Sequence, residues 1–207
     1  MIKVGLINYG SGNFNSVLNT LEFLKIKVIE ISKPDQLDLA THIILPGVGS
    51  FINTMNKLNE RGFIEKLSDE ILKVGKPYLG ICVGLQILAT IGTEFENHKG
   101  LNLVPGIVEK ISIDDNRFNL PHIGWNEVKF QKNNFLFKNI DENSNSFYFV
   151  HSYHLIPEDQ NDLIATCFYG TNVNACVGKD NYYGVQFHPE KSQNDGLQLL
   201  KNFVDLK

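Results

Sequence analysis

Cysteine is scarce in this sequence, and this scarcity excludes several classes of protein. Only Cys82, Cys167 and Cys176 occur among 207 residues. A low and odd number argues against a disulfide framework and suits a reducing compartment. The spacing of the three matches no common zinc-binding pattern, so we expect no metal site.

Long apolar runs and clusters of positive charge are also missing. No segment reaches the length of a membrane span, and the N-terminal apolar run is too short for a signal peptide. The net charge is −4 without a basic run, so binding to nucleic acid or to a membrane is not expected. The glycine-rich stretch 8–13 lacks the third glycine of a dinucleotide fingerprint and the lysine of a P-loop. We therefore expect a cytoplasmic protein without a cofactor.

The order of apolar segments predicts one α/β domain over residues 1–207. In the first half, β-rich runs alternate with segments of helical spacing, which predicts a mostly parallel central sheet flanked by helices. After residue 100 the pattern changes to short strands and turns, which predicts an antiparallel or mixed extension in the C-terminal half. Strands are expected within 2–7, 27–31, 42–45, 78–81, 104–111, 126–130, 146–153, 163–168, 175–179 and 182–187, helices at 16–24, 52–58, 63–74, after Cys82 and at 196–204, and a turn at 121–126.

Cys82 stands at a junction that predicts a nucleophile. The apolar strand 78–81 precedes it, a helical pattern follows it, and Gly80 and Gly84 flank it at two residues on either side. This is the pattern of a nucleophile elbow, a sharp turn whose closely packed backbone requires glycine. The start of a helix also favours a thiolate. The alternative is an inert cysteine buried in the core.

Two further motifs could complete a catalytic site. His188-Pro-Glu190 offers a base and a carboxylate that could orient it, and an extended backbone would put both side chains on one face. Pro46-Gly-Val-Gly-Ser-Phe51 lies between a strand and a helix, where a peptide near Val48 could turn over and donate to an oxyanion. The alternatives are a surface turn at His188 and an ordinary strand-to-helix turn at Val48.

Together these motifs resemble a known family. Gly80-Ile-Cys-Val-Gly-Leu-Gln86 and Gln186-Phe-His-Pro-Glu190 are similar to motifs of the class I, or triad, glutamine amidotransferases. The resemblance runs along essentially the whole chain. Within the family, the sequence most resembles the glutaminase subunit of imidazole glycerol phosphate synthase, a histidine-biosynthetic enzyme. The motifs that narrow it are Asn8-Tyr-Gly-Ser-Gly-Asn13, Pro46-Gly-Val-Gly-Ser-Phe51, Pro121-His-Ile-Gly-Trp-Asn126, Phe149-Val-His-Ser-Tyr153 and His188-Pro-Glu-Lys-Ser192.

The resemblance implies a role for each matching residue. Cys82 would attack the glutamine carboxamide and form a γ-glutamyl thioester, with His188 as base and acid and Glu190 as its orienter. The oxyanion hole would use the N–H of Val83 and a peptide near Val48. For the acidic residue that would contact glutamine, the resemblance implies Glu94, but Glu96 is an alternative because the sequence around the two departs from the family pattern. The residues implied to hold glutamine are Gly49, Gln86, Glu94, Ser152 and Tyr153.

The same resemblance implies a partner. In this family, ammonia passes to a separate (β/α)8-barrel cyclase subunit, and the matching interface positions here are Asn13, Trp125, Tyr148 and Lys191. Without the resemblance, Trp125 would be interpreted as a core aromatic residue.

Several other functions stay open from the sequence alone. Val83, Leu85 and Ile123 depart from the family's usual residues by changes that conserve volume, and they allow a paralogue that supplies ammonia for sugar modification. A γ-glutamyl hydrolase or a cysteine peptidase would share the elbow and the histidine, but would leave the Trp125 motif unexplained.

Overall fold

The computed structural model describes residues 2–10 and 12–206, and it is built around one eight-stranded sheet. The strand order is β2-β1-β3-β4-β14-β13-β12-β9. The first five strands are parallel, and the last three continue the sheet antiparallel. The strands are β1 (Val4–Ile7), β2 (Val28–Ile31), β3 (His42–Leu45), β4 (Tyr78–Ile81), β9 (Lys129–Phe130), β12 (Leu163–Phe168), β13 (Asn172–Lys179) and β14 (Tyr182–Val185).

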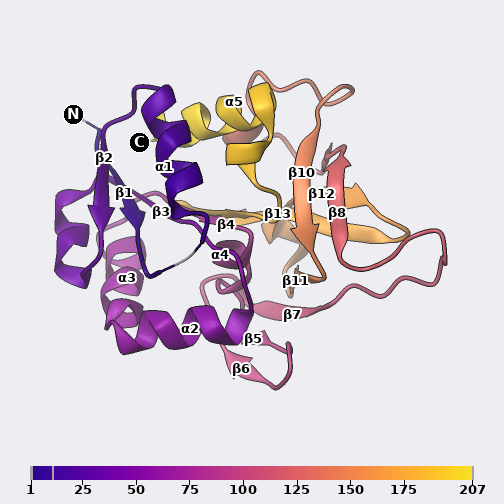
Figure 1. Ribbon diagram of the computed structural model, residues 1–207, viewed down its shortest axis with the longest axis horizontal. Helices are drawn as coiled ribbons and strands as arrows, with labels where there is room; N and C mark the ends of the chain where they lie inside the picture. The colour runs from indigo at the N-terminus through magenta and orange to yellow at the C-terminus, as the bar shows by residue number, and fades with distance from the viewer. Residues whose placement is uncertain (1, 11, 207) are drawn as a thin grey trace.

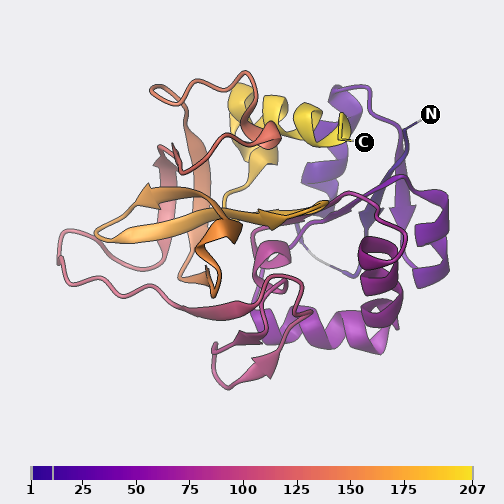
Figure 2. The same cartoon turned by 180° about the vertical axis from the view of Figure 1, so that it is seen from behind.

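Helices cover both faces of this sheet (Figures 1 and 2). One face carries α1 and α5, and the other carries α2 and α3. Neighbouring residues of the parallel strands point to opposite faces, so Leu6 and Ile44 join one core whereas Ile43 and Leu45 join the other. Because both faces are covered, these strands are mostly apolar; the exceptions are Glu30, exposed on the edge strand β2, and His42 at the start of β3. The helices are α1 (Phe14–Phe23), α2 (Phe51–Glu60), α3 (Phe63–Leu72), α4 (Val83–Gln86) and α5 (Gln193–Val204), with 3-10 turns η1 (Pro34–Leu39), η2 (Phe135–Phe137), η3 (Gln160–Asp162) and η4 (Pro189–Lys191).

Two smaller sheets complete the C-terminal half. The first is an antiparallel ribbon, which stands beside α5 in Figure 1, and the second is a mixed sheet of order β11-β7-β5-β6. The predicted α/β class with an antiparallel or mixed extension is therefore confirmed. The ribbon consists of β8 (His122–Asn126) and β10 (Phe147–His151), and the mixed sheet of β5 (Ile91–Gly92), β6 (His98–Lys99), β7 (Gly106–Lys110) and β11 (Tyr153–Pro157).

The predicted turn at 121–126 is wrong, because these residues form strand β8. Pro121 and Gly124 suggested a turn, but Gly124 takes a φ of +130° within the strand and Pro121 only precedes it. The strand exists because β10 pairs with it residue by residue, from Phe147 against Asn126 to His151 against His122.

No helix within the described part of the chain is long and apolar enough to cross a membrane.

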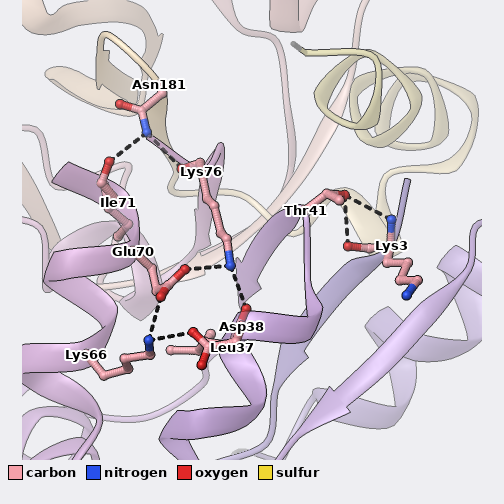
Figure 3. A network of polar contacts seen from close by, with 9 residues as sticks. All are labelled: Lys3, Leu37, Asp38, Thr41, Lys66, Glu70, Ile71, Lys76 and Asn181. Atoms are coloured by element: carbon pink, nitrogen blue, oxygen red, sulfur yellow. Dashed lines mark hydrogen bonds and ion pairs between the residues drawn. The ribbon is translucent and has the colours of Figure 1, made fainter. Parts of the chain in front are cut away.

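A network of ion pairs fixes the approach to β4 (Figure 3). The Glu70 carboxylate on α3 lies 2.7 Å from Lys66 Nζ and 2.5 Å from Lys76 Nζ, and Lys66 also pairs with Asp38. Asn181, just before β14, donates to the carbonyls of Ile71 and Lys76. These contacts hold the starts of strands β4 and β14 next to each other and to the end of α3.

We expect Glu70→Ala to lower the free energy of unfolding by about 3 kcal/mol, because it leaves the mostly buried Lys76 ammonium without its counter-ion. The matched control is Asp69→Ala, which removes an exposed pair with Lys73 and should cost far less, because solvent screens that pair. Urea unfolding of both variants measures the difference. Equal, small losses would mean that the buried pair contributes no more than the exposed one.

Candidate active site

Cys82 occupies a strained turn between β4 and α4. Its φ of 55° and ψ of −108° are unusual for a residue with a side chain. A Cβ on Gly80 would lie 2.1 Å from the Gly84 carbonyl oxygen, and a Cβ on Gly84 would lie 2.2 Å from the Leu45 carbonyl oxygen. Both flanking glycines are therefore required by close backbone contact. The predicted helix after Cys82 is a single turn, Val83–Gln86.

His188 reaches the same end of the sheet from the neighbouring strand. Strand β14 runs parallel to β4 with Val185 beside Ile81, and the Cys82 N–H donates to the Val185 carbonyl at 2.8 Å. Parallel strands bring their carboxyl ends to one edge, so the residues that follow each strand meet there. The His188 N–H then donates to the Tyr148 carbonyl on β10.

Glu190 holds the His188 ring. The two lie 2.8 Å apart, from Nδ1 to Oε1, and neither side chain is exposed. The sequence predicted this pairing from an extended backbone, but only His188 is extended and Glu190 lies within the 3-10 turn η4. The turn begins at Pro189 and bends the carboxylate back toward the ring. Asn13 donates to the same Glu190 Oε1 at 3.2 Å.

The surroundings of His188 favour its charged form. Burial lowers the pKa of the imidazole, but the neighbouring Cys82 and Glu190 side chains outweigh burial and raise it to about 10. The buried Nε2 makes no hydrogen bond within residues 2–10 and 12–206. It is therefore the ring atom left to exchange a proton with the thiol.

We expect Cys82→Ala to lower the pKa of His188, because one of the two groups that raise it is removed. A histidine pKa that is higher in the folded than in the unfolded protein stabilises the fold. The contribution of His188 to the free energy of unfolding is therefore complete below its unfolded-state pKa of about 6.5, and it is lost as the pH rises through about 10. NMR titration of the His188 ring in both proteins measures the change. An unchanged pKa would mean that the thiol and the imidazole are not coupled.

Cys82 opens into a cavity of about 270 Å³, a size that suits a small ligand. The cavity gathers all five residues that the resemblance implied for glutamine, together with Val48 from the oxyanion loop. Glu96 lies exposed on the β5–β6 connection, whereas Glu94 lines the cavity and accepts the N–H of Phe51 at 2.9 Å. The lining residues are Val48, Gly49, Cys82, Gln86, Glu94, Val150, His151, Ser152 and Tyr153.

A chain of amides connects this cavity to the thiol. Gln86 Nε2 lies 3.0 Å from the Tyr153 carbonyl and 3.2 Å from Gln186 Oε1, and Gln186 Nε2 lies 3.7 Å from Cys82 Sγ. Gln186 is fully buried. The sequence motif around His188 includes Gln186, but sequence reasoning gave it no role. Its place two residues before His188 on the same strand end was the available signal.

The loop after β3 has the conformational features of an adjustable peptide. Gly49 has a φ of +124°, which residues with side chains rarely adopt, and a Cβ there would meet no atom within 4 Å. At Gly47, by contrast, a Cβ would lie 2.2 Å from the Val83 side chain. Among the hydrogen bonds of the described residues, none uses the Val83 N–H. This N–H remains available to a ligand beside Cys82.

Three of the four residues implied for a partner interface gather at the surface. Trp125 is 47% exposed, so it is not the core aromatic of the alternative interpretation. Its ring contacts Tyr148 edge-on at 5.9 Å, and Lys191 Nζ lies 5.5 Å from the centre of the Tyr148 ring. With exposed Ile123 on the same strand, they form what we call the aromatic patch: Ile123, Trp125, Tyr148 and Lys191.

Asn13, the fourth implied interface residue, is 5% exposed and touches Glu190 instead. Within the isolated chain it therefore lies behind the triad rather than on the aromatic patch. Ser11, in the middle of the same glycine-rich motif, falls outside the described residues. Among the described residues no group of histidine, cysteine and acidic side chains could hold a metal ion.

Comparisons with known proteins show the family of the chain. The model of the family "Glutamine amidotransferase class-I" matches residues 6–206. The HisH subunit of imidazole glycerol phosphate synthase from Geobacter sulfurreducens is 39% identical, with each chain covered completely. The HisH subunit from Pelagibacter ubique is 42% identical over 99% of this chain and 100% of its own.

Solved structures show the same fold at lower identity. PurLQS from Thermotoga maritima superposes with a TM-score of 0.76 at 19% identity, covering 99% of this chain and 98% of its own. A glutamine amidotransferase from the same organism gives 0.66 at 16% identity, covering 99% of each chain. The full-length matches near 40% identity go further than the fold, and by them the chain belongs to the class I glutamine amidotransferases and, within that family, to the HisH subunits of imidazole glycerol phosphate synthase.

Proposed function

We propose that the chain, as one amidotransferase domain over residues 1–207, hydrolyses glutamine through a Cys82–His188–Glu190 triad. The observation that carries this proposal is the buried Glu190–His188 pair beside a cysteine that opens into a cavity of amino-acid size. An inert core cysteine would have no such cavity and no such base. Cys167 and Cys176 lie deep in the core, where burial raises both thiol pKa values, that of Cys167 to about 12.

The chemistry follows from these positions. Cys82 Sγ attacks the carboxamide carbon of glutamine, and the resulting oxyanion accepts the Val83 N–H and a turned-over peptide near Val48. His188 gives its proton to the departing ammonia, which leaves a γ-glutamyl thioester on Cys82. Water, deprotonated by His188, then attacks the thioester and releases glutamate and the free thiol. Glu190 keeps the ring oriented and stabilises its positive charge.

The cavity suits the two ends of an α-amino acid. Both Nε2 hydrogens of Gln86 are engaged by Tyr153 and Gln186, so its Oε1 is the amide atom left to accept the α-ammonium group. The Glu94 carboxylate can accept from the same group. Backbone N–H groups near Gly49, Ser152 and Tyr153 would receive the α-carboxylate.

The ammonia would pass to a barrel cyclase subunit in the cytoplasm, as the second half of imidazole glycerol phosphate synthesis in histidine biosynthesis. The aromatic patch supports this partner, because exposed tryptophan and tyrosine are typical of interface centres. The patch also adjoins the triad, since Lys191 directly follows Glu190. Relatives matched over their full length are named as subunits of that synthase.

The test is to measure ammonia release from glutamine by the chain alone, with the barrel cyclase subunit of its own organism, and with that complex plus the aminoimidazole acceptor nucleotide. We expect release to rise with the partner and imidazole glycerol phosphate to form with the acceptor. Ammonia without cyclase coupling would favour a paralogue that serves sugar modification. Hydrolysis of γ-glutamyl peptides in place of glutamine would favour a hydrolase.

A further inference from the structure

A pair of buried histidines lies behind the cavity and takes no part in the proposed triad. His122 on β8 is 2% exposed and His151 on β10 is 6% exposed. The two rings meet across the β8–β10 ribbon, with His122 Nδ1 3.1 Å from His151 Nε2. His151 also lines the cavity. Burial of two imidazoles costs free energy unless each nitrogen finds a partner.

The partners of the two rings determine which nitrogens carry hydrogen. His151 Nδ1 lies 2.9 Å from the Tyr153 carbonyl, which can only accept, so Nδ1 is the donor. The Phe168 carbonyl can only accept, so the Asn126 NH₂ group faces it at 2.9 Å and also donates to His122 Nε2 at 3.3 Å. His122 therefore carries its hydrogen on Nδ1 and donates it to His151 Nε2.

Both rings are therefore neutral, and each is held in the Nδ1–H form. Burial alone accounts for the lowered pKa of His122, to about 4, and is the largest cause of the lowered pKa of His151, to about 3. His122 is also stacked between the rings of Phe149 and Tyr169, at 4.6 and 4.0 Å between centres. The ring that donates to His151 cannot easily rotate.

The far end of this chain is the Tyr153 carbonyl, which also accepts from Gln86 Nε2. The carbonyl is thus held from one side by His151 and in turn holds the Gln86 amide on the other. An amide can present either its oxygen or its NH₂ to a ligand, and the Tyr153 carbonyl, together with Gln186 Oε1, holds the NH₂ of Gln86 away from the ligand. Shared hydrogen-bond networks of this kind reinforce each member.

We propose that His151, fixed by His122, is a positioning residue that makes the cavity accept the α-ammonium group of the substrate. It holds the Tyr153 carbonyl, which turns Gln86 so that Oε1 faces the ligand. The inference rests on the proposed glutamine hydrolysis and deepens it. It makes recognition of the amino-acid end separable from the chemistry at Cys82.

Matched substitutions separate the two nitrogens of His151. Asparagine puts its NH₂ near the position of Nδ1 and keeps the donor to Tyr153, whereas glutamine reaches the position of Nε2 and loses that donor. Leucine loses both. We expect His151→Gln and His151→Leu to raise the KM for glutamine about tenfold with kcat changed less than about threefold, and His151→Asn to stay within about threefold of the parent KM.

The measurements use the complex with the barrel subunit. Steady-state glutaminase assays give KM and kcat, and calorimetric titration of L-glutamine into a Cys82→Ala background gives binding without turnover. The ¹⁵N spectrum of the parent should show His151 as the neutral Nδ1–H form. His122→Phe keeps the stacking but removes the donor to His151, so it should weaken glutamine binding several-fold and supplies a second variant if those at His151 do not fold.

The inference is overturned if His151→Asn loses as much affinity for glutamine as His151→Leu, or if the folded His151→Leu and His151→Gln variants bind glutamine like the parent. It is also overturned if folded His122→Phe binds glutamine like the parent, or if the ¹⁵N spectrum shows His151 in the Nε2–H form. These outcomes are distinct from failure of the proposed function. In that case the parent complex itself would neither bind nor hydrolyse glutamine.

Discussion

Replacing Cys82 with alanine should abolish glutamine hydrolysis, lowering kcat by about 10⁴-fold or more, because no other group can form the thioester. The fold should survive, since only a small, buried sulfur is lost. The Glu190→Gln variant should keep a kcat roughly 10²-fold higher than that of Cys82→Ala, because the base remains and only its orientation is impaired. Assays of ammonia release in the partner complex measure both.

The other two cysteines are the controls for this prediction. Cys176→Ala and Cys167→Ala should leave kcat unchanged, since both thiols are buried and burial raises their pKa values. An electrophilic glutamine analogue should label Cys82 alone, as mass spectrometry can determine. Label on Cys176, or equal residual rates for Cys82→Ala and Glu190→Gln, would contradict the assigned roles.

Substitution of Gly49 by valine should lower glutaminase activity of the complex by about 10²–10³-fold, the effect of losing one oxyanion donor. A side chain at a φ of +124° is strained even though a Cβ would touch nothing. The backbone of the loop would therefore move, and the peptide near Val48 would lose its freedom to turn. The KM for glutamine should rise by a smaller factor than kcat falls, because the loop supplies only part of the contacts to the α-carboxylate whereas the oxyanion exists only during the reaction.

Gly75 offers a matched control for Gly49. It too has a positive φ, +82°, with open space where a Cβ would lie, but it belongs to the turn before β4, at the opposite end of that strand from Cys82. Gly75→Val should cost comparable stability and leave kcat intact.

The isolated chain should also be slow, because a partner that favours the turned-over peptide restores the donor. Full activity without the partner would refute control through this loop.

Local patterns were sufficient to predict the sharp turn at Cys82, the pairing of His188 with Glu190 and the class of fold. The two glycines around Cys82 report close backbone packing, and strand β4 is apolar because both of its faces are covered. These are properties of neighbouring residues, so the sequence carries them directly. The family resemblance pointed to the five residues that line the cavity together with Cys82, which local pattern alone did not reveal.

Features that depend on distant partners were missed. Strand β8 looked like a turn because β10, the strand that pairs with it, comes some twenty residues later in the chain. The contact of Asn13 with Glu190, which joins residues far apart in the chain, was not predicted, and the interface role implied for Asn13 stays a prediction. The histidine pair escaped notice for the same reason, since His122 and His151 lie in separate motifs and meet only when the ribbon forms.

The place of β14 in the sheet has a consequence for biosynthesis. This strand comes from the last part of the chain, yet it lies in the interior of the sheet between β4 and β13. As the ribosome releases the polypeptide, β4 is therefore made long before the neighbour that completes it, and its edge stays open to mispairing. His188 lies three residues after the end of β14, so the Cys82–His188 pair of the proposed triad can form only when this late strand docks. Under the proposed function, the nascent chain thus cannot consume glutamine before β14 is in place.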